Sequence, residues 1–383
     1  MKEIYLDNAA TSFPKAPLVG EAMKNYVEKI GVNINRSVYG RAEEAGLAVL
    51  KTREQLKSLF RFPGRVSHVV FTPGNTYALN TIIKGYLKPG DHVLVSSMEH
   101  NAVMRPLLSM PDIAFDRIPC DNAGRLNPDG IAPLIKSNTR LCILAHASNV
   151  SGTVQNVEVC GNILRKFDIP LVLDAAQTAG HIPVDFTALG LSALCVPGHK
   201  GLLGPAGIGA LLMTEEFAAK TNPLITGGTG SASHTEQQPA FMPDKFESGT
   251  ENIPGIYGLS AALSYLERTG LENIRTHEDA MAKRFLDGLA VMQDIAVIGP
   301  KDMQDRTGVI SVDFLRLDNA EAAETLEHTY GILTRCGLHC APHAHKTLGT
   351  FPCGTVRFSV GYATTETEID AALKAIDAVA HTR

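Results

Sequence analysis

The alternation of short apolar segments with helix-like ones restricts the fold of this chain more than any other feature. The segments are mostly apolar on both faces, and they lie at residues 69–72, 92–96, 141–145, 171–173 and 193–196. Strands of this kind are typical of a parallel sheet that is buried between two layers of helices. We therefore expect an α/β protein with a mostly parallel sheet.

Polar residues follow the carboxyl ends of these predicted strands, which is where α/β sheets bind their ligands. They are Thr76, His100, Asn149, Asp174, Gln177 and Lys200. Because the carboxyl ends of neighbouring parallel strands meet at one edge of a sheet, we expect these side chains to surround a single site.

Lys200 lies in the stretch SALCVPGHKGLLGPAGIG, residues 192–209. Pro197 and Gly198 end the preceding strand, so that His199 and Lys200 fall on a turn. A lysine amine in apolar surroundings has a lowered pKa and can form a Schiff base with an aldehyde. On these residues alone a solvated loop lysine is an equal alternative, and the convergence of polar residues on one edge favours the reactive lysine.

The alternation of apolar strand-like segments with helix-like segments ends after residue 213. The chain continues with a glycine-rich loop, GGTGSAS, and a long helical region at 254–292. Strands of alternating pattern are predicted at 309–314 and 356–360, with a helix between them and another at the C-terminus. We expect a smaller α+β domain that closes over the first. Within the first domain, a helix is also predicted around residues 128–137.

Charge and cysteine content exclude several classes of partner and compartment. The net charge of −5 argues against nucleic acid or an anionic membrane surface as the main partner. No signal pattern and no apolar run of membrane-spanning length is present. An odd number of cysteines, seven, without a signal points to the reducing cytoplasm. Four are expected to be inert core thiols: Cys120, Cys142, Cys160 and Cys195.

A set of spaced motifs resembles the class V aminotransferase family. The motifs are YLDNAAT, EHNA, HASNVSGT, DAAQ, GHKGLLGPAGIG, FESGTEN and RCGLHC. Within this family the chain is most similar to the group II cysteine desulfurases, which include selenocysteine lyases. The resemblance implies pyridoxal-phosphate fold type I. It further implies an N-terminal segment, 1–15, that packs on the small domain, a large cofactor-binding domain, 16–253, and a small C-terminal domain, 254–383.

The resemblance assigns the cofactor ring to residues at the strand ends. Lys200 would hold pyridoxal 5'-phosphate, and Asp174 would face the pyridine nitrogen and keep it protonated, which makes the ring an electron sink. His100 would stack on the ring, although a surface histidine at a strand end is the plainer alternative. Gln177 and Asn149 would contact the phenolic oxygen and the substrate region.

The cofactor phosphate is assigned to a second group of residues. Thr76 and His199 would bind it, aided by the helix that starts near Thr76, although an ordinary capped turn would have the same sequence. Thr250 would reach the phosphate of the neighbouring subunit, which implies a homodimer with shared sites. Pro197 stands where the family usually has serine, and it removes one hydroxyl and one backbone donor.

Arg357, in GTVRFSVG, corresponds to the family arginine that clamps the substrate α-carboxylate, a task for which the bidentate guanidinium is suited. The alternative is a surface arginine on a strand. The loop at residues 33–39 would line the way into the site.

The segment TRCGLHCAPHAH, residues 334–345, allows several interpretations. The resemblance makes Cys340 the nucleophile that takes the substrate sulfur as a persulfide. Its thiolate needs a nearby cation or histidine, and Arg335 and His339 are the candidates. A loop with a purely structural role is another interpretation.

A metal site is the main competitor for this segment. Its ligands would be Cys336, His339, Cys340, His343 and His345, which are residue types that zinc accepts. The spacing lacks the pairs of known structural zinc motifs, so we expect no metal. Cys336 stands where the family more often has threonine. Either Cys336 or Cys353 would be able to form a disulfide with Cys340 or to relay a persulfide.

The sequence thus predicts a pyridoxal-phosphate-dependent cysteine desulfurase that releases alanine from L-cysteine and forms a persulfide on Cys340. Its expected partners are the amino acid substrate, a second copy of the chain and a sulfur-acceptor protein. A selenocysteine lyase would use the same residues. A β-lyase or an aminotransferase would not need Cys340, and a sulfur-carrier scaffold would turn over little substrate.

Overall fold

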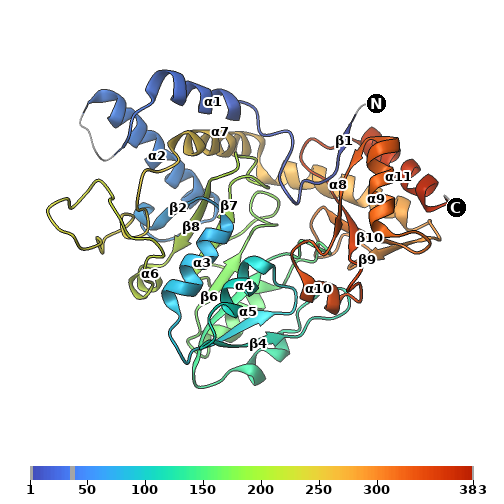
Figure 1. Ribbon diagram of the computed structural model, residues 1–383, viewed down its shortest axis with the longest axis horizontal. Coiled ribbons are helices and arrows are strands. Elements are labelled where there is room, and N and C mark those ends of the chain that lie inside the picture. The colour runs from blue at the N-terminus through green and yellow to red at the C-terminus, as the bar shows by residue number, and fades with distance from the viewer. Residues whose placement is uncertain (1–2, 35–38, 382–383) are drawn as a thin grey trace.

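A seven-stranded sheet forms the centre of the computed structural model, which describes residues 3–34 and 39–381 (Figure 1). The strand order is β2-β8-β7-β6-β5-β3-β4. The strands are β2 (Val69–Thr72), β3 (His92–Ser96), β4 (Ala114–Ile118), β5 (Thr139–Ala145), β6 (Leu171–Asp174), β7 (Ala193–Pro197) and β8 (Gly209–Met213). Only β8 runs opposite to the other six strands of this sheet, so the predicted mostly parallel sheet is confirmed.

Helices cover both faces of this sheet because its strands are apolar on both faces. Successive residues of β3 show this directly: Leu94 belongs to one buried cluster, and Val93 and Val95 belong to the other. The first cluster includes residues of α1 (Val19–Asn25), α2 (Gly40–Leu59), α5 (Val157–Arg165) and α7 (Ile253–Thr269). The second includes residues of α3 (Asn75–Tyr86), α4 (Asn101–Leu108) and α6 (Glu215–Lys220).

The C-terminal part of the chain forms a smaller α+β unit, as predicted. Its sheet is antiparallel and has the order β12-β13-β10-β9. The strands are β9 (Ile295–Ile298), β10 (Val309–Phe314), β12 (Arg335–Gly337) and β13 (Thr355–Ser359). The helices are α8 (Leu271–Leu289), α9 (Asn319–Tyr330), α10 (Pro342–Thr347) and α11 (Glu366–Ala380). The short N-terminal strand β1 (Ile4–Tyr5) pairs with β11 (Ile332–Leu333), and Figure 1 shows it beside this unit.

Hydrophobic packing passes from one unit to the other within α8. Ile274 is the last residue of the large cluster around the main sheet, and Met281 is the first residue of α8 that packs in the small one. The predicted boundary between the large and the small domain, residue 254, falls at the start of α7, which packs on α1 and α2. The hydrophobic changeover therefore comes later in the chain than the change in sequence pattern.

Two predicted helical regions differ in the structure. Residues 128–137 form two 3₁₀ turns, Pro128–Gly130 and Ala132–Leu134, because Pro133 cannot donate a helical hydrogen bond. The helical region predicted at 254–292 is broken into α7 and α8 at Gly270, which has φ 82°.

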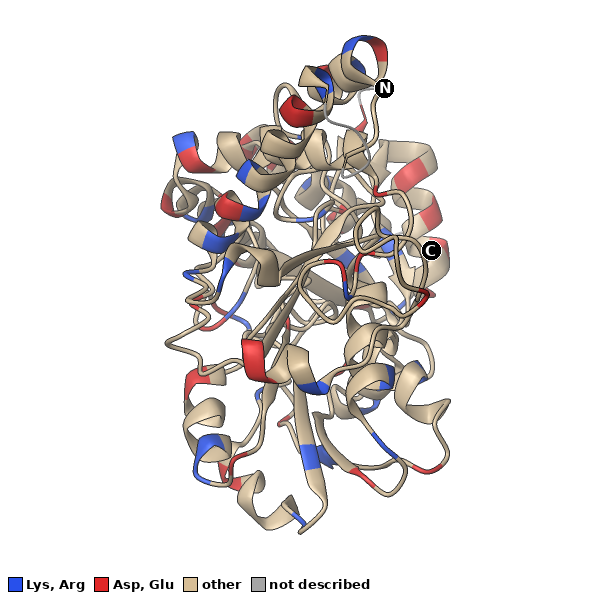
Figure 2. Cartoon of the chain, turned by 90° about the vertical axis from the view of Figure 1, so that its left-hand side faces the viewer, with Lys and Arg blue, Asp and Glu red and all other residues tan. Residues whose placement is uncertain are grey.

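Charged residues lie mainly on the outer helices and loops, and in Figure 2 the two signs are interspersed. None of the helices within residues 3–34 and 39–381 is both long and apolar enough to cross a membrane.

Candidate active site

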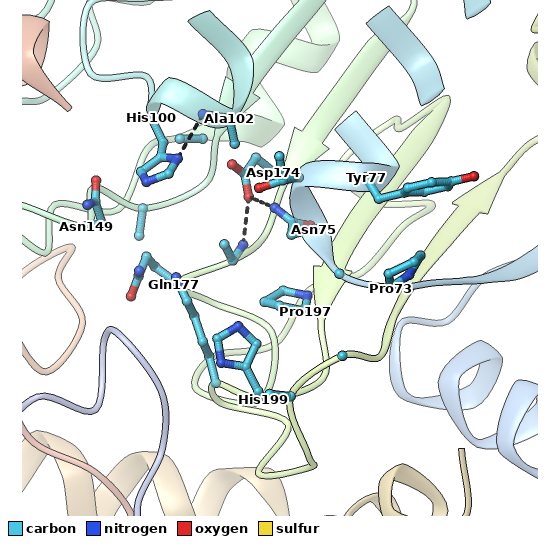
Figure 3. A pocket seen from close by; sticks show the side chains of 18 residues that line it. Pro73, Asn75, Tyr77, His100, Ala102, Asn149, Asp174, Gln177, Pro197 and His199 are labelled. Carbon is cyan, nitrogen blue, oxygen red and sulfur yellow. Dashed lines mark hydrogen bonds between the residues drawn. The ribbon is translucent and has the colours of Figure 1, made fainter. Parts of the chain in front are cut away.

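A cavity of about 430 Å³ lies at the carboxyl ends of β5, β6 and β7, beside the start of α3 (Figure 3). Seven of the ten residues predicted for the site line this cavity: Thr76, His100, Asn149, Asp174, Gln177, His199 and Lys200. The other three, Thr250, Cys340 and Arg357, do not line it. The strand-end residues thus meet at one edge of the sheet, as the alternation of strands and helices predicts.

Lys200 follows β7 and faces the cavity. It retains some accessible surface there, while protein surrounds its amine closely enough that burial lowers the pKa to about 8. The charge of Asp174 opposes this shift, and the charges of Arg357 and Arg335 add to it. Roughly a fifth of the amine is therefore neutral at about pH 7.4, a much larger share than a solvated loop lysine would have.

Asp174 ends β6 and is 4% exposed. Its Oδ1 accepts hydrogen bonds from Asn75 Nδ2 at 2.7 Å and from the Ala176 N–H at 2.9 Å, and Figure 3 shows both. Burial raises the pKa of the carboxyl, while these donors and Lys200 lower it. Sequence reasoning missed Asn75, although its place as the first residue after a Pro-Gly turn was a usable signal.

His100 caps the start of α4, where its Nδ1 accepts a hydrogen bond from the Ala102 N–H at 2.9 Å. A backbone N–H only donates, so the ring hydrogen of the neutral form is on Nε2. Burial, aided by the charge of Lys200, lowers the pKa of His100 to about 4. The structure therefore holds a neutral imidazole at the cavity wall, in a defined tautomer, and the surface alternative is wrong.

The opposite end of the cavity has the features of an anion site. Residues 73–77 line it and lead into α3, whose N-terminus carries a partial positive charge and open N–H groups. Thr76 is exposed there. Burial lowers the pKa of His199 to about 4, so His199 offers an N–H rather than a charge. Pro197 also lines the cavity and offers neither a hydroxyl nor an N–H.

Lys15 ties the N-terminal segment to the turn that carries Lys200. Its amine donates to the carbonyl of His199 at 2.8 Å, to Thr11 Oγ1 at 2.9 Å and to Ser12 Oγ at 3.1 Å. Burial lowers the pKa of Lys15 to about 8. Sequence reasoning missed this lysine because nothing in its local sequence relates it to a residue far along the chain.

Asn149 connects the cavity with the small domain. Its carbonyl accepts a hydrogen bond from Arg357 Nη1 at 3.2 Å, and its Nδ2 donates to the carbonyl of His339 at 2.6 Å. Arg357 is 1% exposed, and its Nη2 donates to Asp7 Oδ1 at 2.6 Å. The alternative of a surface arginine is wrong. Asn149 thus lies next to both Arg357 and the loop that carries Cys340.

Cys340 is exposed and lies between β12 and α10. Its carbonyl accepts a hydrogen bond from the Asn101 N–H at 2.7 Å, which holds Cys340 beside the helix that His100 caps. Arg335 Nη2 lies 3.8 Å from the sulfur. His339 is buried, its Nε2 faces Thr355 Oγ1, and burial lowers its pKa to about 2. Of the two candidate cations, only Arg335 supplies charge at the thiol.

The other histidines of this loop have separate partners. His343 Nδ1 faces the carbonyl of Ser97, and His345 Nδ1 faces Thr350 Oγ1. Within the described parts of the chain, no three side chains of His, Cys, Asp or Glu are grouped so that they could hold a metal ion.

All seven cysteines are free thiols. Three of the four predicted core thiols are buried, and the fourth, Cys120, is half-buried. Cys353 is exposed, like Cys340, and Cys336 is half-buried on β12. Of the loop predicted to line the way into the site, residues 35–38 lie outside the described residues.

Thr250 is exposed and follows Gly249, which has φ 96°. The preceding Glu247 is anchored from α2 by Arg53, through bonds of 2.7 and 2.6 Å. Thr250 therefore lies on a short exposed segment that Glu247 anchors to α2, and it does not line the cavity of its own chain.

Comparison with known proteins decides the family. Residues 4–372 match the family described as aminotransferase class-V. The chain belongs to the class V aminotransferase family. The predicted resemblance is thereby confirmed for nearly the whole chain.

Relatives within the class V family include cysteine desulfurases from archaea. A probable cysteine desulfurase of Methanothermobacter thermautotrophicus is 32% identical over 96% of this chain and 92% of its own length. A cysteine desulfurase of Haloferax volcanii is 30% identical over 98% of this chain and 89% of its own.

Solved structures of the same kind share the fold. The apo cysteine desulfurase of Thermococcus onnurineus superposes with a TM-score of 0.91 at 31% identity, over 98% of this chain and 94% of that one. The cysteine desulfurase CsdA of Escherichia coli, as its S-sulfonic acid, gives 0.87 at 28% identity, over the same shares of the two chains. The expected fold type is confirmed.

Proposed function

We propose that this class V protein is a pyridoxal-phosphate-dependent cysteine desulfurase that acts on L-cysteine as a cytoplasmic homodimer. One observation carries the proposal. A cavity lined by Lys200 and a buried Asp174 is joined through Asn149 to an exposed thiol, Cys340, that has a guanidinium 3.8 Å away. Seven free thiols fit a reducing compartment.

The residues around the cavity fit pyridoxal phosphate. The amine of Lys200, with a pKa of about 8, suits attachment to an aldehyde. Asp174 offers a buried carboxylate to a pyridine nitrogen, and His100 offers a neutral ring face. The start of α3 and His199 suit a phosphate. When bound, this cofactor supplies an electron sink for the negative charge that develops at the substrate α-carbon.

The chain's own residues would then divide the work on the amino acid. Arg357 binds the α-carboxylate, since its guanidinium reaches Asn149 at the cavity wall. Gln177 and Asn149 orient the bound groups from the same wall. Lys200, as a neutral amine, removes the α-proton and holds it on Nζ.

Cys340 would receive the sulfur. Its thiolate attacks the substrate sulfur, a new S–S bond forms, and the Cβ–S bond breaks with its electron pair remaining on the carbon side. Protonation of that carbon gives alanine, and Cys340 is left as a persulfide. The positive charge of Arg335 favours the thiolate. An external thiol, which we expect on an acceptor protein, then takes the sulfur from the exposed loop.

The first prediction tests this role by Cys340→Ala in the full chain loaded with the cofactor. Alanine release from L-cysteine should fall about a thousandfold or more, because the attacking nucleophile is lost. The yellow colour of the loaded protein should remain. Cys353→Ala is the matched control, since it removes another exposed thiol, and it should keep the wild-type rate.

Mass spectrometry after one turnover without reductant should find one additional sulfur on the peptide that contains Cys340. A wild-type rate in Cys340→Ala would refute the desulfurase mechanism and leave a β-lyase. Additional sulfur on Cys336 or Cys353 alone would move the nucleophile to that residue. Loss of cysteine turnover with selenocysteine breakdown retained would agree with the proposal, because the weaker carbon–selenium bond breaks with less help.

A further inference from the structure

Arg357, which we propose for the substrate carboxylate, is already paired with a carboxylate of the protein. Its Nη2 donates to Asp7 Oδ1 at 2.6 Å, and its Nη1 donates to the carbonyl of Asn149 at 3.2 Å. Asp7 belongs to the N-terminal segment and its side chain is 21% exposed, against 1% for Arg357. A buried guanidinium without a counter-ion is costly, so Asp7 compensates Arg357 when no substrate is bound.

One donor of the guanidinium is still open. Arg357 Nε is buried and has no hydrogen-bond partner among residues 3–34 and 39–381. A carboxylate that binds arginine in a bidentate manner takes two parallel N–H groups. Since Nη1 is directed at Asn149, the pair left for an incoming carboxylate is Nε with Nη2, and Nη2 is the nitrogen that Asp7 holds.

The local charge balance favours a second carboxylate. Two guanidinium groups, Arg357 and Arg335, act on the amine of Lys200 together with two carboxylates, Asp174 and Asp7. Among the described residues no carboxylate forms an ion pair with Arg335. The side chain of Arg335 contacts the sulfur of Cys340. Asp174 is bonded to Asn75 and to the Ala176 N–H, so Asp7 is the carboxylate that pairs with a guanidinium here. An amino acid would bring a further carboxylate.

The backbone around Asp7 is fixed, so competition for Arg357 concerns the side chain. Asp7 forms a parallel bridge with Ser359, next to which the Ala9 N–H donates to Ser359 Oγ at 2.8 Å. On the other side, the Leu6 N–H donates to the carbonyl of Leu333 at 2.9 Å. The carboxylate is therefore held at the guanidinium by two strands of the small unit.

We infer that Asp7 is a built-in competitor of the substrate α-carboxylate for Arg357, which weakens amino acid binding and lets alanine leave. This inference rests on the proposed carboxylate-binding role of Arg357. Asp7 is a positioning residue in this scheme, because it acts on the substrate through the arginine.

The second prediction tests this inference with Asp7→Asn and with propionate as the probe. Without propionate, the variant should unfold at a lower temperature than the wild type, because Arg357 loses its counter-ion. Propionate should then raise the unfolding temperature with an apparent Kd at least about tenfold lower than in the wild type, because the competing charge is gone. The inhibition constant of L-alanine should fall in the same direction.

Asp370→Asn is the matched control. It removes an aspartate from an arginine pair, with Arg284 at 2.7 and 2.8 Å, on the exposed face of the small unit. It should respond to propionate as the wild type does. Adding Arg357→Gln to Asp7→Asn should abolish the response. Asp7→Ser also removes the charge and replaces Asp7→Asn if that variant does not fold.

An unchanged or weaker propionate Kd in Asp7→Asn would overturn the inference, as would a response that survives Arg357→Gln. Propionate binding needs no turnover, so the proposed function fails separately. Tighter propionate binding in a protein that releases no alanine from cysteine would refute the desulfurase and leave the competition intact.

Discussion

In the proposed function the amine of Lys200 reacts in its neutral form, and burial is the main reason why its pKa is lowered towards neutral pH. Burial is the largest influence on its pKa, the charge of Asp174 opposes it, and two guanidinium groups contribute less. Burial therefore destabilises the folded protein while Lys200 is protonated, and this cost disappears when the amine loses its proton.

The third prediction concerns this cost and its pH dependence. Lys200→Met should stabilise the cofactor-free protein by roughly 3 kcal/mol at pH 7, since a pKa lowered from 10.5 to about 8 corresponds to that free energy. The folded protein releases the proton first, so wild-type stability rises with pH between about 8 and 10.5. The advantage of the variant should therefore shrink over that interval.

Chemical unfolding of both proteins between pH 7 and 11 measures this difference, and other titrating groups cancel in the comparison. A difference that stays constant across the interval would show that the amine of Lys200 is not desolvated.

The sequence predicted the site residues that lie at or just after the ends of strands. It did not predict contacts between side chains that are far apart in the sequence. Asp174 ends β6 and Lys200 follows the end of the neighbouring strand β7, so their meeting followed from the alternation of elements. Asp7 contacts a residue 350 positions away, and Lys15 contacts one 184 positions away. No local sequence pattern encodes such contacts. The sequence also offered both Arg335 and His339 as the group that favours the Cys340 thiolate, and only the structure separates them, because His339 is buried and uncharged.

At the scale of elements, the turn after β6 determines where the Lys200 loop can lie. Gly180 has φ 87°, and a Cβ at this position would come within 2.0 Å of the Gly201 carbonyl oxygen. The two backbones therefore touch directly, one residue beyond the reactive lysine. Only glycine satisfies both the left-handed backbone and the missing side-chain volume.

The fourth prediction compares Gly180→Ala with Gly90→Ala. Both glycines have φ near 88°, at 87° and 89°, but nothing lies within 4 Å of a Cβ at Gly90. Gly90→Ala should lower the free energy of unfolding by about 1–2 kcal/mol, the backbone strain alone. Gly180→Ala should lower it by about 4 kcal/mol or more and reduce cofactor uptake, because the Lys200 loop must move. Equal losses in urea unfolding would mean that the contact with Gly201 has no energetic weight.

Elements with a strong pattern were predictable, and those interrupted by special residues were not. The strands β5, β6 and β7 contain the apolar segments 141–145, 171–173 and 193–196 and appear where expected. The helix expected at 128–137 fails because Pro133 interrupts it, and Gly270 divides a helical region that reads as continuous. The direction of β8 was also open, because a short glycine-rich connection from β7 permits an antiparallel pair that apolar content alone does not reveal.

At the scale of the whole molecule, the residues proposed to bind and attack the substrate come from three parts of the chain. Asn149 comes from the large unit, Arg357 and Cys340 come from the small one, and Asp7 comes from the N-terminal segment. Their contacts depend on how the units pack, so the sequence alone indicated Asn149, Arg357 and Cys340 without their connections, and it did not indicate Asp7. Thr250 is exposed and does not line the cavity of its own chain, so a role in cofactor binding would depend on packing against a second copy.

The fifth prediction tests whether Thr250 completes the site of a second copy. Thr250→Val keeps the shape and removes the hydroxyl, so cofactor affinity should fall about tenfold through loss of a hydrogen bond to the phosphate. Thr329→Val is the control, because Thr329 is exposed on α9 and distant from the cavity, and it should bind the cofactor normally.

A mixed dimer separates action across subunits from action within one chain. We would co-express Thr250→Val with Lys200→Ala under different affinity tags and purify the dimer that carries both. If Thr250 acts across the interface, one site combines the intact Lys200 of the first chain with the intact Thr250 of the second. That dimer should then bind one cofactor with wild-type affinity, although neither parent homodimer does. If Thr250 acts within its own chain, both sites of the mixed dimer stay defective, and a monomer with full cofactor occupancy would refute the shared site altogether.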